Sequence, residues 1–206
     1  MKINKSFIQS AQRGRIWDFG NDILYNLCKK YPDHKKKEVI LAKIWLIGRA
    51  YSASIERRKN KKDENENDSF YTEVVIPNMY KSQLDKRLHT LRSYRTIDDQ
   101  SIPHILGAHK YLVDIFTKIS GLNKRSLASK YLHFHLPKLF YLYDSRAAYS
   151  VSQIMPRYRI EKIRGAYDQV YMKFFLKVYD LSNELYKRYN VRLAPREMDN
   201  LLLNLY

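Results

Sequence analysis

Apolar residues recur along this chain at intervals of three and four positions, the spacing that places them on one face of a helix. Between breaks at prolines and polar runs, the pattern predicts helices over 18–31, 37–58, 79–93, 101–119, 127–135, 147–154, 159–189 and 197–205, with a short helix or a loose arm over 2–12. Residues 70–76 alternate as a short strand would, but an extended segment or a helical start that breaks at Pro77 is favoured. No alternation lasts long enough to build a sheet, so the sequence predicts an all-α fold.

The segment 37–58 is apolar on almost every side through its middle, which predicts a buried central helix. Its second half holds small residues that let a neighbouring helix or a ligand approach closely: Gly48, Ala50, Ser52, Ala53 and Ser54. The stretch that follows, 59–69, is polar, low in complexity and without an apolar residue to anchor it. We therefore expect a mobile polar loop there.

The chain has 206 residues, of which 45% are hydrophobic and 14% aromatic, and this is enough for a packed core. We predict a single all-helical domain over 1–206. Two lobes that share a core are compatible with the helix pattern, one formed by 1–36 together with 145–206 and the other by 37–144.

The formal charge of +17 and the isoelectric point near 9.8 predict a polyanionic partner. Lys and Arg are spread along the chain rather than gathered on one amphipathic helix, which favours nucleic acid over a membrane surface. No apolar run of about 18 residues is present, and the first residues lack the apolar core of a secretion signal. We expect a cytoplasmic protein, associated with the nucleoid if it binds DNA.

The cysteine and histidine content argues against a disulfide, a metal site and a cofactor. Cys28 is the single cysteine and lies in an apolar pattern typical of a small core residue. His133 and His135 are two positions apart, and His104 and His109 are five apart. A metal pair on one helix needs a spacing of three or four. We expect neither a metal nor a cofactor.

The candidate functional residues lie in residues 120–146, a segment that combines basic residues, two predicted helical stretches and an aspartate. A turn follows one helix, Pro137 ends the next, and the apolar run 139–143 then leads to Asp144 and Arg146. Asp144 or Ser145 would be the N-cap of the next helix, and in that position Asp144 would contribute about 1 kcal/mol. Capping does not exclude a catalytic role, because a catalytic carboxylate could use the same geometry.

A helix, a tight turn, a second helix and a loop ending in aspartate resemble an element of the helix–hairpin–helix DNA glycosylases, the base-excision repair superfamily of endonuclease III and MutY. The matching residues are Arg125, Ser126, Ala128, Leu132, Phe140, Leu142 and Asp144. Ser126 and Asp144 lie 18 positions apart, the interval that this superfamily keeps between its hairpin-helix position and its catalytic aspartate. Residues 43–46 are similar to the start of the buried helix in MutY-like enzymes.

The resemblance implies a helical bundle of two lobes and an enzyme that releases a damaged or modified base from DNA. Ser126 stands where bifunctional members carry the lysine that forms a Schiff base, so it implies a hydrolytic, monofunctional enzyme. Two features depart from the family pattern. Residues 122–124 replace the usual Gly-x-Gly of the hairpin, and Gly48 occupies the position of MutY's general acid.

In this interpretation, Asp144 is the catalytic carboxylate, which stabilises positive charge on the sugar and activates water. The residues expected to hold the phosphates around an extruded nucleotide are Asn123, Lys124, Arg125, Ser126, Lys130 and Arg146. The residues expected near the base, each of which also suits a core position, are Trp45, Tyr51, Glu56 and Tyr143.

Two other classes of function stay open. A non-catalytic nucleic-acid-binding protein, such as a mobile-element or phage-defence factor, would show the same charge and hairpin. The altered hairpin and the missing general acid favour that class. An all-α interaction protein whose charge is incidental is the third. For the first two classes we expect DNA rather than RNA as the partner, although the sequence does not name the polymer.

Overall fold

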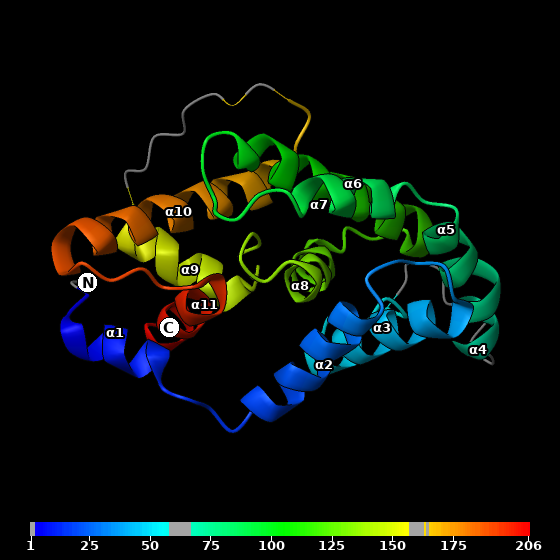
Figure 1. Ribbon diagram of the computed structural model, residues 1–206, viewed down its shortest axis with the longest axis horizontal. Coiled ribbons are helices and arrows are strands. Elements are labelled where there is room, and N and C mark those ends of the chain that lie inside the picture. Colours follow the sequence, from blue (N-terminus) through cyan, green and yellow to red (C-terminus); the bar gives the residue numbers. More distant parts are fainter. Residues whose placement is uncertain (1–2, 58–66, 157–162, 164) are drawn as a thin grey trace.

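The structure is a computed structural model that describes residues 3–57, 67–156, 163 and 165–206 (Figure 1). Over these residues the secondary structure is helical and no strand forms, which confirms the all-α prediction. Nearly all of their buried apolar side chains make up one connected hydrophobic core. A chain of this length can bury such a core without a second domain.

The helices of the N-terminal half are α1 (Lys5–Gln12), α2 (Asp18–Lys30), α3 (Lys37–Ala50), α4 (Asn67–Ser69), the π-helix η1 (Phe70–Val75), α5 (Ile76–Tyr80) and α6 (Leu84–Leu91). Those of the C-terminal half are α7 (Ser101–Ser120), α8 (Arg125–His135), α9 (Ser145–Ile154), α10 (Gln169–Tyr189) and α11 (Pro195–Asn204). The helices expected near 18–31, 101–119, 147–154 and 197–205 are confirmed with small shifts at their ends.

Local capping signals explain where several of these helices begin and end. The side-chain oxygen of Asn4 accepts the N–H of Phe7 at 3.1 Å and starts α1. Asp168 accepts the N–H of Tyr171 at 2.9 Å in the same way and starts α10. Gly121 adopts a left-handed conformation with φ of 69° at the end of α7, as its position in the sequence predicts.

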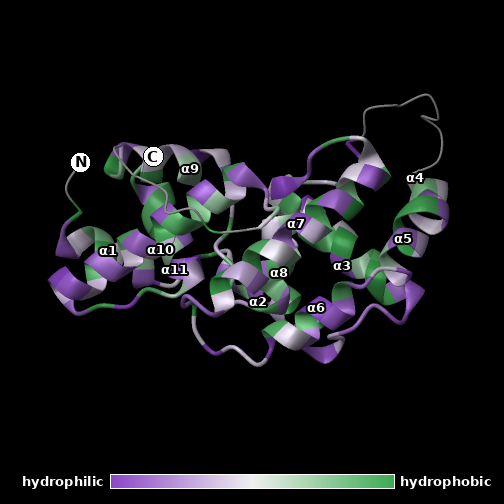
Figure 2. Ribbon diagram, turned by 90° about the horizontal axis from the view of Figure 1, so that it is seen from above, coloured by the Kyte–Doolittle hydropathy of each residue, from purple (hydrophilic) through white to green (hydrophobic). Residues whose placement is uncertain are grey.

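Helix α8 lies in the middle of the molecule, with α7 on one side and α2 and α3 on the other (Figure 1). At one end, α1 packs against α11, which packs against α9, and α9 packs against α10. In both views this group lies opposite α4 and α5 (Figures 1 and 2). The division into lobes stays a prediction, and α2 packs against α3 and α8 although 18–30 fall in the other predicted lobe.

The central position of α8 requires a helix that is buried nearly all round. Residues 127–134 are all buried, and they include the polar side chains of Ser129, Lys130 and His133. Each large apolar side chain removed from water contributes about 1.5–3 kcal/mol to stability. The polar side chains lose their hydration, so each needs a partner inside the protein. Those partners determine the arrangement around Asp144.

Helix α3 is shorter than the sequence predicts, because it ends at Ala50 instead of continuing to 58. Ser52 takes up a left-handed backbone conformation with φ of 51°, which reverses the chain. The N–H of Ala53 donates to the carbonyl of Gly48 at 2.8 Å and closes the turn. This reversal brings Ile55 into the core, where it is fully buried.

The segment after α3 also differs from expectation. Of the polar loop expected over 59–69, residues 59–66 lie outside the described residues, whereas 67–69 are helical. Residues 70–75 form a π-helix, which agrees with the helical start among the alternatives and contradicts the strand and the extended segment. Pro77 falls in the first turn of α5, where a helix does not need the N–H that proline lacks. The helical conformation therefore continues through Pro77.

Two further helix predictions need correction. The helix predicted over 79–93 is divided between α5 and α6, and Ser82 bonds to both the Met79 carbonyl and the Leu84 N–H at the break. The helix predicted from 159 begins at Gln169 in the described part of the chain, while 157–162 and 164 lie outside it.

Candidate functional site around Asp144

The turn between α7 and α8 makes a closed helical hairpin. The N–H of Gly121 donates to the carbonyl of Thr117 at 2.8 Å and ends α7. Asn123 then accepts the N–H of Arg125 on its side-chain oxygen at 3.1 Å as α8 begins. The two helices pack against each other. The hairpin therefore forms although its turn lacks Gly-x-Gly.

Asp144 occupies the N-cap position of α9, at the end of the segment that follows α8. Its Oδ1 accepts the backbone N–H of Arg146 at 2.9 Å and the guanidinium Nε of the same residue at 3.3 Å. Its Oδ2 lies 3.8 Å from the ammonium Nζ of Lys130 on α8. The side chain is 25% exposed, so the carboxylate is fixed on one side and meets solvent on the other.

The surroundings of Asp144 keep its carboxylate ionised. Partial burial raises the pKa of Asp144, but the N–H of Arg146 and the charge of Lys130 outweigh burial and leave that pKa below its ordinary value. Burial lowers the pKa of Lys130, while the charge of Asp144 opposes that effect. At neutral pH the site therefore presents a fixed negative charge between two cations.

Side chains of α8 hold the backbone that carries Asp144. Ser126 Oγ donates to the carbonyl of Tyr143 at 3.2 Å, and the N–H of Tyr143 donates to Ser129 Oγ at 2.9 Å. The Nζ of Lys130 donates to Ser126 Oγ at 2.6 Å and to the Tyr143 carbonyl at 3.3 Å. The structure thus brings Ser126, Lys130 and Asp144 together, and the first two position the third.

The remaining hairpin cations are bound within the protein. Lys124 donates from Nζ to the carbonyl of Ser54 at 2.9 Å and also to the carbonyl of Arg57. Arg125 donates from Nε to Asp168 Oδ1 at 2.6 Å, where the carboxylate also caps α10. These contacts tie the hairpin to the turn after α3 and to the start of α10. Much of the charge expected to face phosphates is neutralised or bound internally.

Helix α11 adds two residues that the sequence did not assign to the site. Arg196 pairs through Nη1 with Asp199 Oδ2 at 3.1 Å. Burial raises the pKa of Asp199 to about 6, the cations Arg196 and Lys130 oppose that rise, and Asp144 adds to it. Asp199 lies 55 positions after Asp144, and the packing of α11 against α9 brings the two near each other. The spacing of these two aspartates in the sequence does not predict that they lie near each other.

Tyr51 lies beside the same cluster, at the end of α3. Its hydroxyl donates to Asn21 Oδ1 at 2.6 Å. The Nζ of Lys130 and the guanidinium carbon of Arg196 each lie 5.7 Å from the centroid of its ring. Asn21 Nδ2 and Arg196 Nε are buried and, within the described residues, lack a hydrogen-bond acceptor. An acceptor group that reached these donors would be stabilised there.

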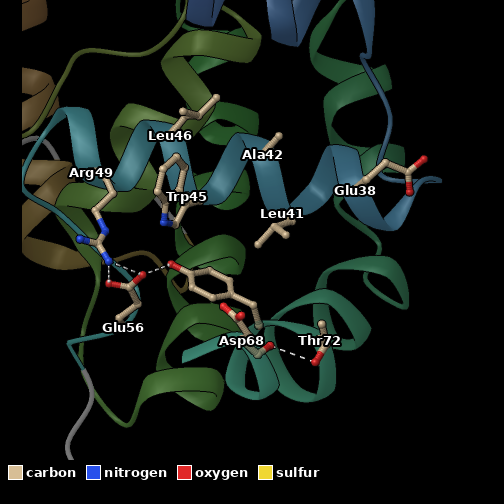
Figure 3. Close-up of a pocket in the computed structure, with 10 residues that line it drawn as sticks. Glu38, Leu41, Ala42, Trp45, Leu46, Arg49, Glu56, Asp68 and Thr72 are labelled. Atoms are coloured by element: carbon tan, nitrogen blue, oxygen red, sulfur yellow. Dashed lines mark hydrogen bonds and ion pairs between the residues drawn. The ribbon is translucent and has the colours of Figure 1, made fainter. Parts of the chain in front are cut away.

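The four residues expected near the base do not line a single cavity. Trp45 and Glu56 line a cavity of about 740 Å³ between α3 and the helical residues 68–72 (Figure 3). Tyr143 lines a second cavity, of about 380 Å³, between α9 and α10. Tyr51 lies among the cations and carboxylates described above. The structure therefore separates the expected base pocket into three places.

A second polar network is buried between the α2–α3 turn, α6 and α8. The imidazole of His34 bonds to the Asp85 carboxylate through Nδ1 and to the Tyr131 hydroxyl through Nε2 at 2.6 Å. Lys43, which is fully buried, donates to the carbonyl of Asp33 at 3.2 Å, and burial lowers its pKa to about 8. Since their partners lie inside the protein, these groups join the turn to α6 and α8.

The part of the chain that the structure describes contains no group of three or more His, Cys, Asp or Glu placed to hold a metal ion. None of its helices is both long and apolar enough to cross a membrane. Comparison of the chain with protein-family models, with curated proteins and with solved structures gave no match. The function is therefore argued from the chemistry of the site.

Proposed function

We propose that this protein binds nucleic acid, with DNA as the expected polymer, and that Asp144 promotes hydrolysis of the N-glycosidic bond of an extruded base. The oxygen of a water molecule bonds to the sugar carbon, the N-glycosidic bond breaks, and the base leaves with a proton. One observation carries the proposal. An ionised, partly exposed carboxylate is fixed at the start of α9, beside the α7–α8 hairpin, in a chain with a formal charge of +17. Departure of a base leaves positive charge on the sugar, and a preorganised carboxylate stabilises that charge.

The contacts of Asp144 suit this role. Arg146 and Lys130 hold the carboxylate in place, so little reorganisation is needed when charge develops on the substrate. A hydrolytic reaction also agrees with Ser126, because a hydroxyl stands where a Schiff-base lysine would be required. Sodium borohydride trapping of a covalent complex with DNA would contradict this assignment and would implicate Lys130, whose Nζ lies 2.6 Å from Ser126 Oγ.

The contacts to phosphate are assigned more narrowly than the sequence suggests. Lys124 and Arg125 bond to groups inside the protein, and Lys130 is almost fully buried. Arg146 has a side chain that is 55% exposed and lies next to Asp144. We therefore assign the main phosphate contact at the site to Arg146, with Asn123 at the exposed surface of the hairpin turn.

The decisive experiment replaces Asp144 with asparagine. Asparagine caps helices about as well as aspartate, so Asp144→Asn removes the charge and keeps the start of α9. We expect release of a base from a panel of damaged and modified duplexes to be lost, with DNA affinity unchanged or slightly raised. Asp114→Asn, at an exposed position of α7, is the matched control and should keep full activity. Unchanged base release in Asp144→Asn would refute the catalytic role.

A second candidate function is non-catalytic nucleic-acid binding, as in a mobile-element or phage-defence factor. Gly48, at the position of MutY's general acid, has no side chain that could protonate a departing base, and this favours non-catalytic binding. Because Lys124 and Arg125 bond inside the protein, cations elsewhere in the chain would then contact the phosphates. In this case no duplex of the panel would lose a base. Binding would still weaken steeply with salt, with a slope of about −0.9 for each phosphate neutralised on duplex DNA. Salt-independent or absent binding would instead favour an interaction protein.

A further inference from the structure

The largest cavity described above lies on the outer side of α3, away from the core. Glu38 and the Arg49–Glu56 pair lie at opposite ends of its row of lining residues, with Leu41 and Trp45 between them (Figure 3). Its volume of about 740 Å³ is within the range of about 300–1,000 Å³ that small-molecule sites occupy. The cavity therefore has an apolar middle and charged ends.

The charge of this cavity opposes that of the whole protein. Among the described residues, three carboxylates line it, those of Glu38, Glu56 and Asp68, and one guanidinium, that of Arg49. Glu56 is bonded to Arg49 at 2.6 Å. Glu38 and Asp68 form no ion pair with a cation of the described residues. The described residues of the lining thus carry two excess negative charges in a chain of +17.

Trp45, an aromatic residue of the cavity lining, already makes a cation–π contact with Arg49. Trp45 is 44% exposed, so part of its ring is accessible to a ligand. The guanidinium carbon of Arg49 lies 5.9 Å from the centroid of the Trp45 ring, within cation–π range. A ligand cation on the rest of that ring face would gain the same attraction, strengthened by the nearby carboxylates.

The length of the cavity along α3 favours an extended ligand. Glu38 and Arg49 are 11 positions apart on α3, so a rise of about 1.5 Å per residue separates them by roughly 16 Å along the helix. An apolar strip formed by Leu41, Ala42 and Trp45 joins the two ends. We propose that this cavity binds a linear aliphatic polyamine, whose ammonium groups meet Glu38 and Asp68 and whose methylene chain covers the apolar strip.

This site is separate from the proposed nucleic-acid site. A nucleotide would bring phosphate charge close to Glu38 and Asp68, and repulsion between like charges opposes its entry. Asp144 does not line this cavity, and α4 and α9 lie in opposite halves of the molecule in both views (Figures 1 and 2). The polyamine site therefore does not require that Asp144 be catalytic, and each of the two proposals can fail without the other.

Fluorescence titration with spermine tests the proposal. Trp17→Phe leaves Trp45 as the single tryptophan, because the chain has two. In this background we expect a saturable change in emission as spermine is added at constant ionic strength. The double substitution Glu38→Gln and Asp68→Asn should weaken binding by about tenfold or more. Glu73→Gln, an exposed carboxylate of η1 outside the cavity, is the matched control and should change affinity less than about twofold.

Three probes of other chemistry distinguish the alternatives. Dodecane-1,12-diol has a similar chain without charge, and equal binding of the diol would overturn the role of the carboxylates. Adenosine binding with higher affinity than spermine would make the cavity a base pocket and overturn the proposal. A lysine-rich peptide that displaces spermine at much lower concentration would replace the small molecule with a protein segment. Equal spermine binding by the double variant, with an unchanged melting temperature, would place the polyamine elsewhere and also refute it.

Discussion

Replacing Asp199 with asparagine should stabilise the protein at neutral pH. The residue is only 6% exposed, and burial raises the pKa of its carboxyl from the ordinary 3.8 to about 6. Arg196, Lys130 and Arg15 lower that pKa and Asp144 raises it, so the value already includes the attraction of the neighbouring cations. Folding therefore favours the protonated form, and the ionised form of Asp199 is destabilising in the folded protein.

The size and sign of the effect follow from linkage. Because the pKa is higher in the folded state, the folding penalty is absent below the unfolded pKa near 3.8, grows as pH rises, and is complete above about 6. One pKa unit corresponds to about 1.36 kcal/mol, so the full penalty is about 3 kcal/mol. Asparagine cannot ionise but keeps an oxygen that accepts from Arg196. We expect Asp199→Asn to gain about 3 kcal/mol at pH 7.5 and less than about 1 kcal/mol at pH 4.

Urea unfolding of the two proteins at a series of pH values measures this difference. The slope of stability against denaturant should be the same in both, which shows that the variant has not changed the extent of unfolding. Asp114→Asn, on the exposed surface of α7, should change stability by less than about 0.5 kcal/mol at every pH. A stability difference between Asp199→Asn and the parent that does not vary between pH 4 and 7.5, or a loss of stability at pH 7.5, would refute the reasoning.

Two glycines and the cysteine give further predictions. Gly107→Ala, inside α7 with open space around the added methyl, should stabilise by about 0.5–1 kcal/mol in urea unfolding. Gly48→Ala should instead destabilise by about 1 kcal/mol, because its methyl would lie 3.3 Å from the backbone Cα of Ser54; equal effects of the two substitutions would contradict this contact. Cys28 is 2% exposed and burial raises its pKa to about 12, so iodoacetamide should alkylate it only as the protein unfolds. Rapid alkylation in the native protein would show that the thiol is accessible.

Local signals in the sequence account for most of the secondary structure. Helical periodicity, the position of Gly121 and the capping carboxylate of Asp144 each act within one or two turns of the chain. Such signals do not depend on the rest of the fold, so they can be read without it. The same signals predicted the hairpin between α7 and α8 and the carboxylate that follows it.

Tertiary contacts determined two features that the local sequence pattern predicts wrongly or leaves open: the end of α3 and the burial of Lys43. The helical pattern of α3 continues past Ala50, but burial of Ile55 and the turn at Ser52 end the helix there. Lys43 has a charged side chain that periodicity alone cannot place inside the core. Its burial depends on the carbonyl of Asp33, which the α2–α3 turn brings within 3.2 Å.

For the candidate site too, some features follow from the sequence and others only from the tertiary structure. The sequence by itself determined that the protein is all-α and strongly basic, and that a helix would begin at Asp144 or Ser145, because these properties depend on composition and on neighbouring residues. Only the tertiary structure placed Asp199 near Asp144, bonded the hairpin cations inside the protein, and opened a cavity beside Trp45. These features depend on how distant helices pack, and the spacing of residues along a chain does not encode the distance between helices that meet in the fold.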